Sequence, residues 1–259
     1  MNRNLYFSEI AWRSEVGLHR EGNEDSGLVS STLVAVADGM GGYVGGEIAS
    51  STVIRKLESA RSLISHEEID PQSREEFLRS AVEDMDNAIA AVAEERPELS
   101  GMGTTLTALT LVGSHAVLLH IGDSRAYRVR GKTITRLSHD HTVVQELIDQ
   151  GRITADEVAD HPQRSFLTQA LMGNRNLQPA LLAFPIEKDD IFLLCSDGLT
   201  NVVDEGAIAQ SFTSSLSDAV NSLVDLTYKN GAPDNVTVIA LRIGENQYDG
   251  QTVFIGAAS

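Results

Sequence analysis

Short apolar runs bounded by turn residues recur along most of the chain, and longer segments with helical periodicity interrupt them. Runs of this length that are rich in β-branched residues predict buried strands. We expect strands at residues 5–14, 26–37, 104–112, 116–121, 125–130, 133–137, 177–184, 190–195 and 235–243. Apolar residues spaced three and four apart predict amphipathic helices at 47–64, 73–95 and 215–229.

The strand-rich and helix-rich segments are segregated along the chain rather than alternating. This order favours an α+β fold over a wound sheet of parallel strands. No abrupt change in composition marks a boundary between domains, and residues 246–259 are largely polar and contain glycine. We therefore expect one domain over residues 1–245, followed by a flexible C-terminal tail over 246–259.

An aspartate stands at one end of each of four apolar runs. Asp38 follows residues 33–37, Asp123 follows 117–122, Asp197 follows 191–196, and Asp234 lies just before 236–241. A buried carboxylate without a partner is costly, so four of them need a shared compensating charge. Bound cations would supply that charge, and these strand ends therefore predict a metal-dependent enzyme.

The formal charge of −17 restricts the partners of the chain. An acidic protein lacks the basic face that phosphate backbones and anionic membranes require, so we expect neither nucleic acid nor a membrane as partner. Cys195 is the only cysteine, which excludes an intrachain disulfide and a cysteine-based zinc site. The N-terminus has no signal-peptide pattern, and no apolar run is long enough to span a bilayer, so we expect a cytoplasmic protein.

The candidate metal ligands all bind through oxygen. Glu24 and Asp25 add to the four aspartates, and the histidines show no zinc-site spacing. Carboxylates and carbonyls suit Mg²⁺ or Mn²⁺, and the glycine after Asp38 lets a backbone carbonyl approach an ion. A structural calcium site is the alternative, but the acids are scattered along the chain and no calcium-loop pattern is present.

Two hard cations lying close together suit the hydrolysis of a phosphoester by a bridging water. Such a substrate also needs a group that holds its phosphate, and a guanidinium can do so with two hydrogen bonds. Arg20 stands shortly before Glu24 and is the candidate for this task. The glycine-rich segment 39–46 is not a nucleotide-binding P-loop, because no Lys-Ser or Lys-Thr pair follows it.

A series of short motifs extends these observations over nearly the whole chain. They are Gly17-Leu-His-Arg-Glu-Gly-Asn-Glu-Asp25, Val36-Ala-Asp-Gly-Met-Gly-Gly42, Gly46-Glu-Ile-Ala-Ser50, Gly103-Thr-Thr105, Gly122-Asp-Ser-Arg-Ala-Tyr127, Ser138-His-Asp-His-Thr142, His161-Pro162, Leu167-Thr-Gln-Ala-Leu171, Leu194-Cys-Ser-Asp-Gly-Leu199 and Asp234-Asn-Val-Thr237. In these motifs the chain resembles the metal-dependent protein Ser/Thr phosphatases of the PPM (type 2C) family in their compact bacterial form. The resemblance implies two antiparallel β-sheets packed as a sandwich and flanked by helix pairs, with residues 143–176 forming a mobile flap beside a metal cleft.

The resemblance also implies roles for the acidic residues. Asp38 would bridge two Mn²⁺ or Mg²⁺ ions, and the carbonyl of Gly39 would bind the second of them. Asp197 and Asp234 would complete the first ion's ligands.

Four further residues receive roles by the same resemblance. Glu24 and Asp25 would lie near the second ion and act mostly through its waters. Asp123, together with Asp197, would hold a weaker third ion, and Arg20 would clamp the substrate phosphate.

The proton donor for the leaving group is not assigned. Eukaryotic relatives place a histidine where this chain has Met40, and many bacterial relatives place one where it has Tyr43. A tyrosine of ordinary pKa is not tuned for proton donation, so we expect a metal-bound water to serve. We expect His161 to be structural.

These expectations lead to a phosphatase acting on phosphoserine and phosphothreonine in proteins. Its partners would be phosphoprotein substrates and a cognate bacterial Ser/Thr kinase, and we expect a monomer. The alternative is a catalytically silent phosphoprotein-binding module on the same fold, which would predict loss of Asp38, Asp197 or Asp234, and all three are present. Enzymes of this family that act on anti-sigma-factor antagonists usually carry sensor domains, for which 259 residues leave no room.

Overall fold

The computed structural model describes residues 4–41, 45–64, 71–174 and 177–259. The strands are β1 (Tyr6–Glu15), β2 (Asp25–Val29), β3 (Leu33–Met40), β4 (Gly103–Thr104), β5 (Leu106–Val112), β6 (His115–Ile121), β7 (Arg125–Arg130), β8 (Thr133–Arg136), β9 (Ala180–Pro185), β10 (Ile191–Cys195), β11 (Val236–Gly244) and β12 (Val253–Gly256). The helices are α1 (Gly45–Ile64), α2 (Pro71–Glu95), α3 (Val143–Asp149), α4 (Asp197–Thr200), α5 (Glu205–Ser211) and α6 (Leu216–Lys229), with short 3-10 turns η1 (Pro97–Leu99) and η2 (Ala155–Glu157).

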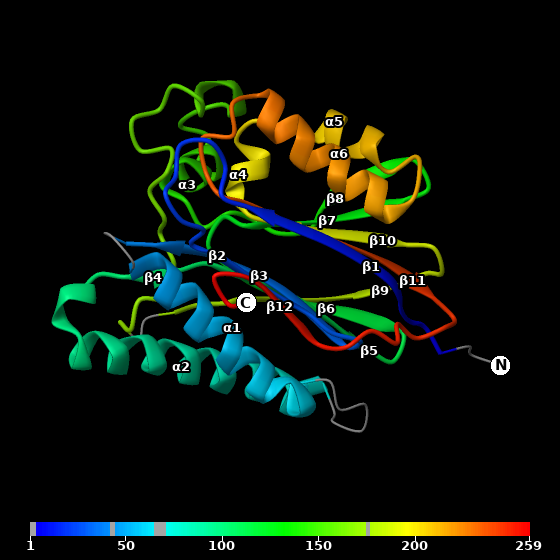
Figure 1. Cartoon of the computed structure of the whole chain (residues 1–259), viewed down its shortest axis with the longest axis horizontal. Helices are drawn as coiled ribbons and strands as arrows, with labels where there is room; N and C mark the ends of the chain where they lie inside the picture. Colours follow the sequence, from blue (N-terminus) through cyan, green and yellow to red (C-terminus); the bar gives the residue numbers. More distant parts are fainter. Residues whose placement is uncertain (1–3, 42–44, 65–70, 175–176) are drawn as a thin grey trace.

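The strands form two antiparallel sheets that face each other. One sheet has the order β1-β11-β10-β7-β8, and the other has the order β12-β2-β3-β5-β6-β9 with β4 paired to β3. Helices α1 and α2 cover the outer face of the second sheet, and α4 to α6 lie over the outer face of the first (Figure 1). The predicted α+β sandwich with helices on both sides is therefore confirmed.

Three apolar clusters hold these layers together. Side chains from both sheets, including Phe7, Val36 and Phe192, interdigitate between the sheets and are fully buried. Leu57 and Met85 belong to the cluster under α1 and α2, and a third cluster lies under α4 to α6. No helix in the described parts of the chain is long and apolar enough to cross a lipid bilayer.

The predicted strand at 26–37 is wrong as a single element. The segment folds as a hairpin in which β2 and β3 pair side by side, so that Asp25 lies opposite Asp38. Ser30 makes the turn, because its hydroxyl accepts a hydrogen bond from the Leu33 N–H at 3.0 Å and donates one to the Leu33 carbonyl at 2.8 Å. Serine side chains readily replace strand hydrogen bonds in this way.

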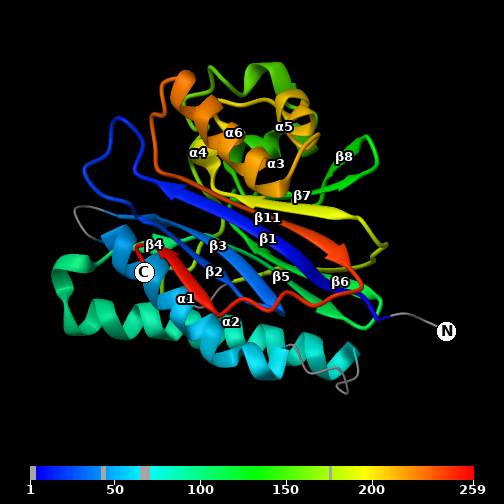
Figure 2. The same cartoon turned by 45° about the vertical axis from the view of Figure 1, so that its right-hand side comes forward.

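The expectation of a flexible tail is also wrong. Residues 253–256 form β12, which pairs antiparallel with β2 and lies alongside it in Figure 2. Ile255 is buried, Phe254 lies under the guanidinium of Arg55 at 5.2 Å, and the same arginine donates to the Ala258 carbonyl at 2.8 Å. The single apolar triplet Val-Phe-Ile within an otherwise polar segment supplies the burial that fixes the tail.

Replacing Ile255 with alanine should lower the free energy of unfolding by about 3 kcal/mol, as for other buried isoleucines. Its side chain fills the space above Gly27, where an added Cβ would lie 2.6 Å from it. Thr252→Ala, at an exposed position just before β12, should change stability by less than about 0.5 kcal/mol. Chemical denaturation of both variants measures the difference, and equal stability would mean that β12 is not docked.

Candidate active site

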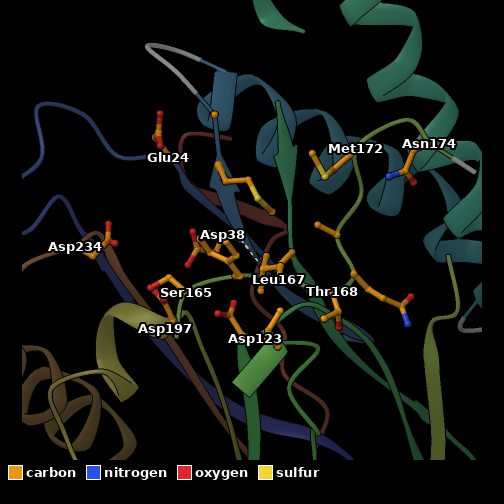
Figure 3. A pocket seen from close by; sticks show the side chains of 18 of the residues that line it. Glu24, Asp38, Asp123, Ser165, Leu167, Thr168, Met172, Asn174, Asp197 and Asp234 are labelled. Atoms are coloured by element: carbon orange, nitrogen blue, oxygen red, sulfur yellow. Dashed lines mark hydrogen bonds between the residues drawn. The ribbon is translucent and has the colours of Figure 1, made fainter. Parts of the chain in front are cut away.

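Four strand ends meet around one pocket of about 670 Å³ at one end of the sandwich. Asp38 stands near the end of β3, Asp123 follows β6, Asp197 begins α4 directly after β10, and Asp234 precedes β11. All four aspartates line the pocket, and Figure 3 shows Asp38, Asp197 and Asp123 grouped, with Asp234 beside them. The two sheets thus bring together carboxylates that are far apart in the sequence.

The loop before β2 supplies two further residues of the pocket, Glu24 and Arg20. The guanidinium of Arg20 lies 2.7 Å from Oδ2 of Asp234, so it reaches the carboxylate group from the rim of the pocket. Arg20 is about half exposed, which leaves it open to a ligand.

Asp25 differs from the other predicted ligands because it does not line the pocket. It is buried, with 1% of its surface exposed, and its Oδ2 accepts a hydrogen bond from the Ser196 hydroxyl at 2.7 Å. It lies opposite Asp38 in the β2–β3 pair. Its position therefore supports an indirect influence on the site through charge and packing.

Two glycines permit close backbone contacts at the site. A Cβ on Gly39 would overlap the Gly46 carbonyl, and a Cβ on Gly198 would overlap the carbonyl of Asn235. Glycine is needed at both positions because the strand ends are packed against neighbouring backbone.

Burial and mutual repulsion of the carboxylates set the electrostatics of the pocket. Desolvation first, and then the neighbouring carboxylates, raise the pKa of Asp38 well above its ordinary value. The same causes raise the pKa of Asp123 to about 8. The pKa of Asp197 is also raised, although a hydrogen bond with the Asp38 carboxyl acts in the opposite direction. This much negative charge in one desolvated pocket calls for positive compensation.

The donor chemistry fits hard divalent cations. In the described parts of the chain, no three histidine, cysteine, aspartate or glutamate side chains already converge as a finished coordination shell. The pocket nevertheless offers carboxylate oxygens from five residues, and such oxygens are the ligands that Mg²⁺ and Mn²⁺ prefer. A bound cation would offset the mutual repulsion of these carboxylates.

Without divalent cations, the stability of the protein should fall as the pH rises from about 7 to about 8. Burial raises the pKa of Asp25 to about 7 and that of Asp123 to about 8, whereas both are ionised in the unfolded chain at this pH. The folded state therefore binds more protons than the unfolded state, and stability decreases with rising pH. Thermal unfolding in EDTA measures this effect. An unfolding temperature that stays constant or rises would contradict it.

Residues 23–229 match the family model described as protein phosphatase 2C. The chain belongs to this family. It is 41% identical to the serine/threonine protein phosphatase PstP of Mycobacterium tuberculosis over 264 residues, which cover 100% of this chain and 50% of that protein. It is 35% identical to the serine/threonine phosphatase stp of Listeria welshimeri, covering 88% of this chain and 93% of that protein.

The fold agrees with solved structures of the family. The catalytic domain of PstP in complex with two manganese ions superposes with a TM-score of 0.83 at 38% identity, covering 93% of this chain and 99% of that chain. The family and the fold expected from the motifs are confirmed. The chain spans about half the length of the mycobacterial relative that it matches.

Asn235 fixes the loop that brings Arg20 and Glu24 to the pocket of this phosphatase 2C member. Its side-chain amide donates to the carbonyls of Val16 at 2.7 Å and Gly22 at 2.8 Å, and its Oδ1 accepts the Glu24 N–H at 2.8 Å. Sequence reasoning identified the Asp234-Asn235 motif but assigned no role to the asparagine. The residue type was a usable signal, because a side-chain amide can donate and accept hydrogen bonds at once and so can hold a loop.

A second network supports the turn at Asp123. His141 accepts the Gly122 N–H at 3.1 Å through Nδ1, and its ring lies 5.0 Å from that of His120. Asp140 accepts three hydrogen bonds from the guanidinium of Arg125, two residues after Asp123. The motif at 138–142 was recognised in the sequence, but its supporting role depends on contacts across the fold.

The segment expected to form a flap supplies the wall opposite the carboxylates. Residues between Ser165 and Asn174, together with Leu177, line the pocket. Met40 lines it as well, but a thioether has no proton to donate. Tyr43 lies outside the described residues. His161 does not line the pocket and accepts the Gln163 N–H at 3.2 Å, in keeping with a structural role.

Proposed function

We propose that this member of the protein phosphatase 2C family hydrolyses phosphoserine and phosphothreonine in proteins with the help of divalent metal ions. The observation that supports the proposal is the convergence of Asp38, Asp123, Asp197 and Asp234 on one pocket beside Arg20. The curated relatives PstP and stp are serine/threonine phosphatases, and a PstP structure contains two manganese ions.

The proposed metal ligands are those that the resemblance to the family implies, and all of them line the pocket. Asp38 would be shared by two ions, with Asp197 and Asp234 on the first and the Gly39 carbonyl on the second. Bound as a pair, Mn²⁺ or Mg²⁺ would supply a water of lowered pKa and would neutralise phosphate charge.

The remaining acidic residues have lesser parts in the proposal. Asp123 and Asp197 would hold a weaker third ion, while Glu24 borders the pocket. Asp25 is buried, lies opposite Asp38 and is repelled by Asp197 and Asp234. In the proposal it binds no ion directly and affects the site only through its charge.

Arg20 would hold the substrate phosphate. A guanidinium has five N–H donors in a planar fork, and the contact with Asp234 uses one end of it. The other donors remain able to bind phosphate oxygens while the ion pair persists. The pair would therefore orient Arg20 toward the carboxylates, where the phosphate would bind.

The proposal is tested by hydrolysis of a phosphothreonine peptide in EDTA and after addition of Mn²⁺ or Mg²⁺, with phosphate release as the measurement. Activity should be absent in EDTA and return with the metal. Binding of Mn²⁺ measured by calorimetry gives a readout independent of turnover. Activity that survives complete chelation would contradict the proposal, and metal binding without hydrolysis would favour the silent binding module.

The proposed activity implies phosphoprotein substrates. We also propose a cognate Ser/Thr kinase that phosphorylates these substrates. The expectations of a monomer, of a cytoplasmic location and of no binding to nucleic acid or membranes stay predictions, as does the mobility of segment 143–176.

A further inference from the structure

The two walls of the pocket differ in chemical character. One wall carries the carboxylates and Arg20, whereas the segment between residues 143 and 177 contributes no charged side chain among its described lining residues. Figure 3 shows Asp38, Asp197 and Asp234 on one side and Leu167, Thr168 and Met172 on the other. The apolar side chains of this second wall are Val143, Phe166, Leu167, Ala170, Met172 and Leu177. A phosphate would bind at the first wall, and the rest of a substrate would contact the second.

Phe166 and Met172 are the exposed apolar side chains of this wall. Phe166 is 57% exposed and Met172 is 40% exposed, while most large apolar side chains of the described chain are buried. Apolar groups left in water beside a binding pocket are typical of interaction sites, because a ligand can remove them from water.

Hydrogen bonds hold the backbone at both residues. Phe166 donates its N–H to the Gln163 carbonyl at 3.1 Å and accepts the Val143 N–H at 2.9 Å. Met172 donates its N–H to Oδ1 of Asp86, a buried side chain of α2, at 3.0 Å. These contacts fix the backbone from which both side chains project toward the pocket.

The residues on either side of Met172 are also held by hydrogen bonds. Asp86 also accepts the Gly173 N–H at 2.7 Å, and Leu171 pairs with Thr104 through two backbone hydrogen bonds of 2.9 and 3.0 Å. A Cβ on Gly103 would lie 2.7 Å from Cγ of Met172, so this side chain packs directly on the backbone of β4. The exposed position of Met172 is thus imposed by its surroundings.

We propose that Phe166 and Met172 form a subsite for an apolar side chain next to the phosphorylated residue of the substrate. The inference rests on the proposed function and adds a substrate class, namely phosphopeptides with a residue such as leucine beside the phosphothreonine or phosphoserine. A glutamate at that place would lose hydration against an uncharged wall and would be repelled by the carboxylates of the facing wall.

The test compares phosphothreonine peptides in a serine–glycine background, with one leucine placed in turn at each neighbouring position. At the best position, leucine should raise kcat/KM by about 5- to 10-fold over the serine-only peptide, which corresponds to partial burial of one leucine side chain. Phe166→Ala and Met172→Ala should each reduce this ratio to about 2-fold or less. Taking the ratio within each variant removes any loss of overall activity.

Leu182→Ala is the matched control, since Leu182 is 42% exposed on β9 and does not line the pocket. It should leave the leucine ratio unchanged. Hydrolysis of p-nitrophenyl phosphate should be unchanged in Leu182→Ala, which lies outside the pocket.

Hydrolysis of the serine-only peptide without a gain from leucine at any position would overturn the subsite and leave the proposed function intact. A leucine preference that survives in both Phe166→Ala and Met172→Ala would also overturn it. Absence of metal-dependent hydrolysis of every substrate would overturn the proposed function and the subsite together.

Discussion

Replacing Asp38 with asparagine should lower kcat/KM for a phosphothreonine peptide by about three orders of magnitude. Asp38 lies among the carboxylates that line the pocket, and in the proposed function it is shared by two ions, so its loss would remove several kcal/mol of transition-state stabilisation. Steady-state kinetics with saturating Mn²⁺ measure the loss. A decrease of less than about tenfold would mean that Asp38 is not a shared ligand.

The same substitution should raise the stability of the metal-free protein. The pKa of Asp38 is raised in the folded state, so burying this group, which is ionised in the unfolded chain at neutral pH, costs folding energy that the neutral asparagine avoids. Mn²⁺ should raise the unfolding temperature of the wild type, and this increase should be largely lost in Asp38→Asn. Asp84→Asn, at an exposed position of α2, is the control and should change neither property. A metal-free variant less stable than the wild type would contradict this interpretation.

Replacing Asn235 with alanine should lower both stability and activity. The substitution leaves two carbonyls and one N–H without their partner, at a cost of about 3 kcal/mol in the free energy of unfolding. It also releases the loop that positions Arg20, and a displacement of about 1 Å can reduce turnover roughly 100-fold.

Denaturation and phosphopeptide kinetics measure the two effects separately. Asn221→Ala, on the exposed face of α6, controls for loss of an asparagine and should stay within about 0.5 kcal/mol of the wild type. Rescue is informative as well, because Asn235→Asp keeps the acceptor for the Glu24 N–H but loses both donated hydrogen bonds. Activity of Asn235→Ala equal to that of the wild type would show that Arg20 is positioned by other contacts.

Local pattern was sufficient for most of the secondary structure. Helices α1, α2 and α6 lie where apolar spacing placed them, because each buries a single apolar face against a sheet. The hairpin at Ser30 was missed because residues 26–37 contain no glycine or proline turn signal after Gly27, and a serine side chain makes the turn instead. The short strand β12 was missed because its apolar residues are few and its partner, β2, lies more than two hundred residues away in the chain.

The residues of the site likewise fall into those found from the sequence and those that were missed. Glu24, Asp38, Asp123, Asp197 and Asp234 were all found in the sequence and all line the pocket. Asp25 was grouped with them as well; it lies opposite Asp38 in the β2–β3 pair, but it is buried and does not line the pocket. Asp86 was not found, although an acid on the apolar face of α2, between Val82 and Ile89, was a signal that could have been read.

The sequence by itself determined which carboxylates end buried strands and which motifs accompany them, because alternation and turn chemistry are local properties of the chain. Only the tertiary structure decided that Asp38 and Asp197, from opposite sheets, share one pocket, that Asn235 fixes the Arg20 loop, and that an uncharged wall faces the carboxylates. These relations depend on which sheets pack together and which backbone groups then need partners. No local window contains that information.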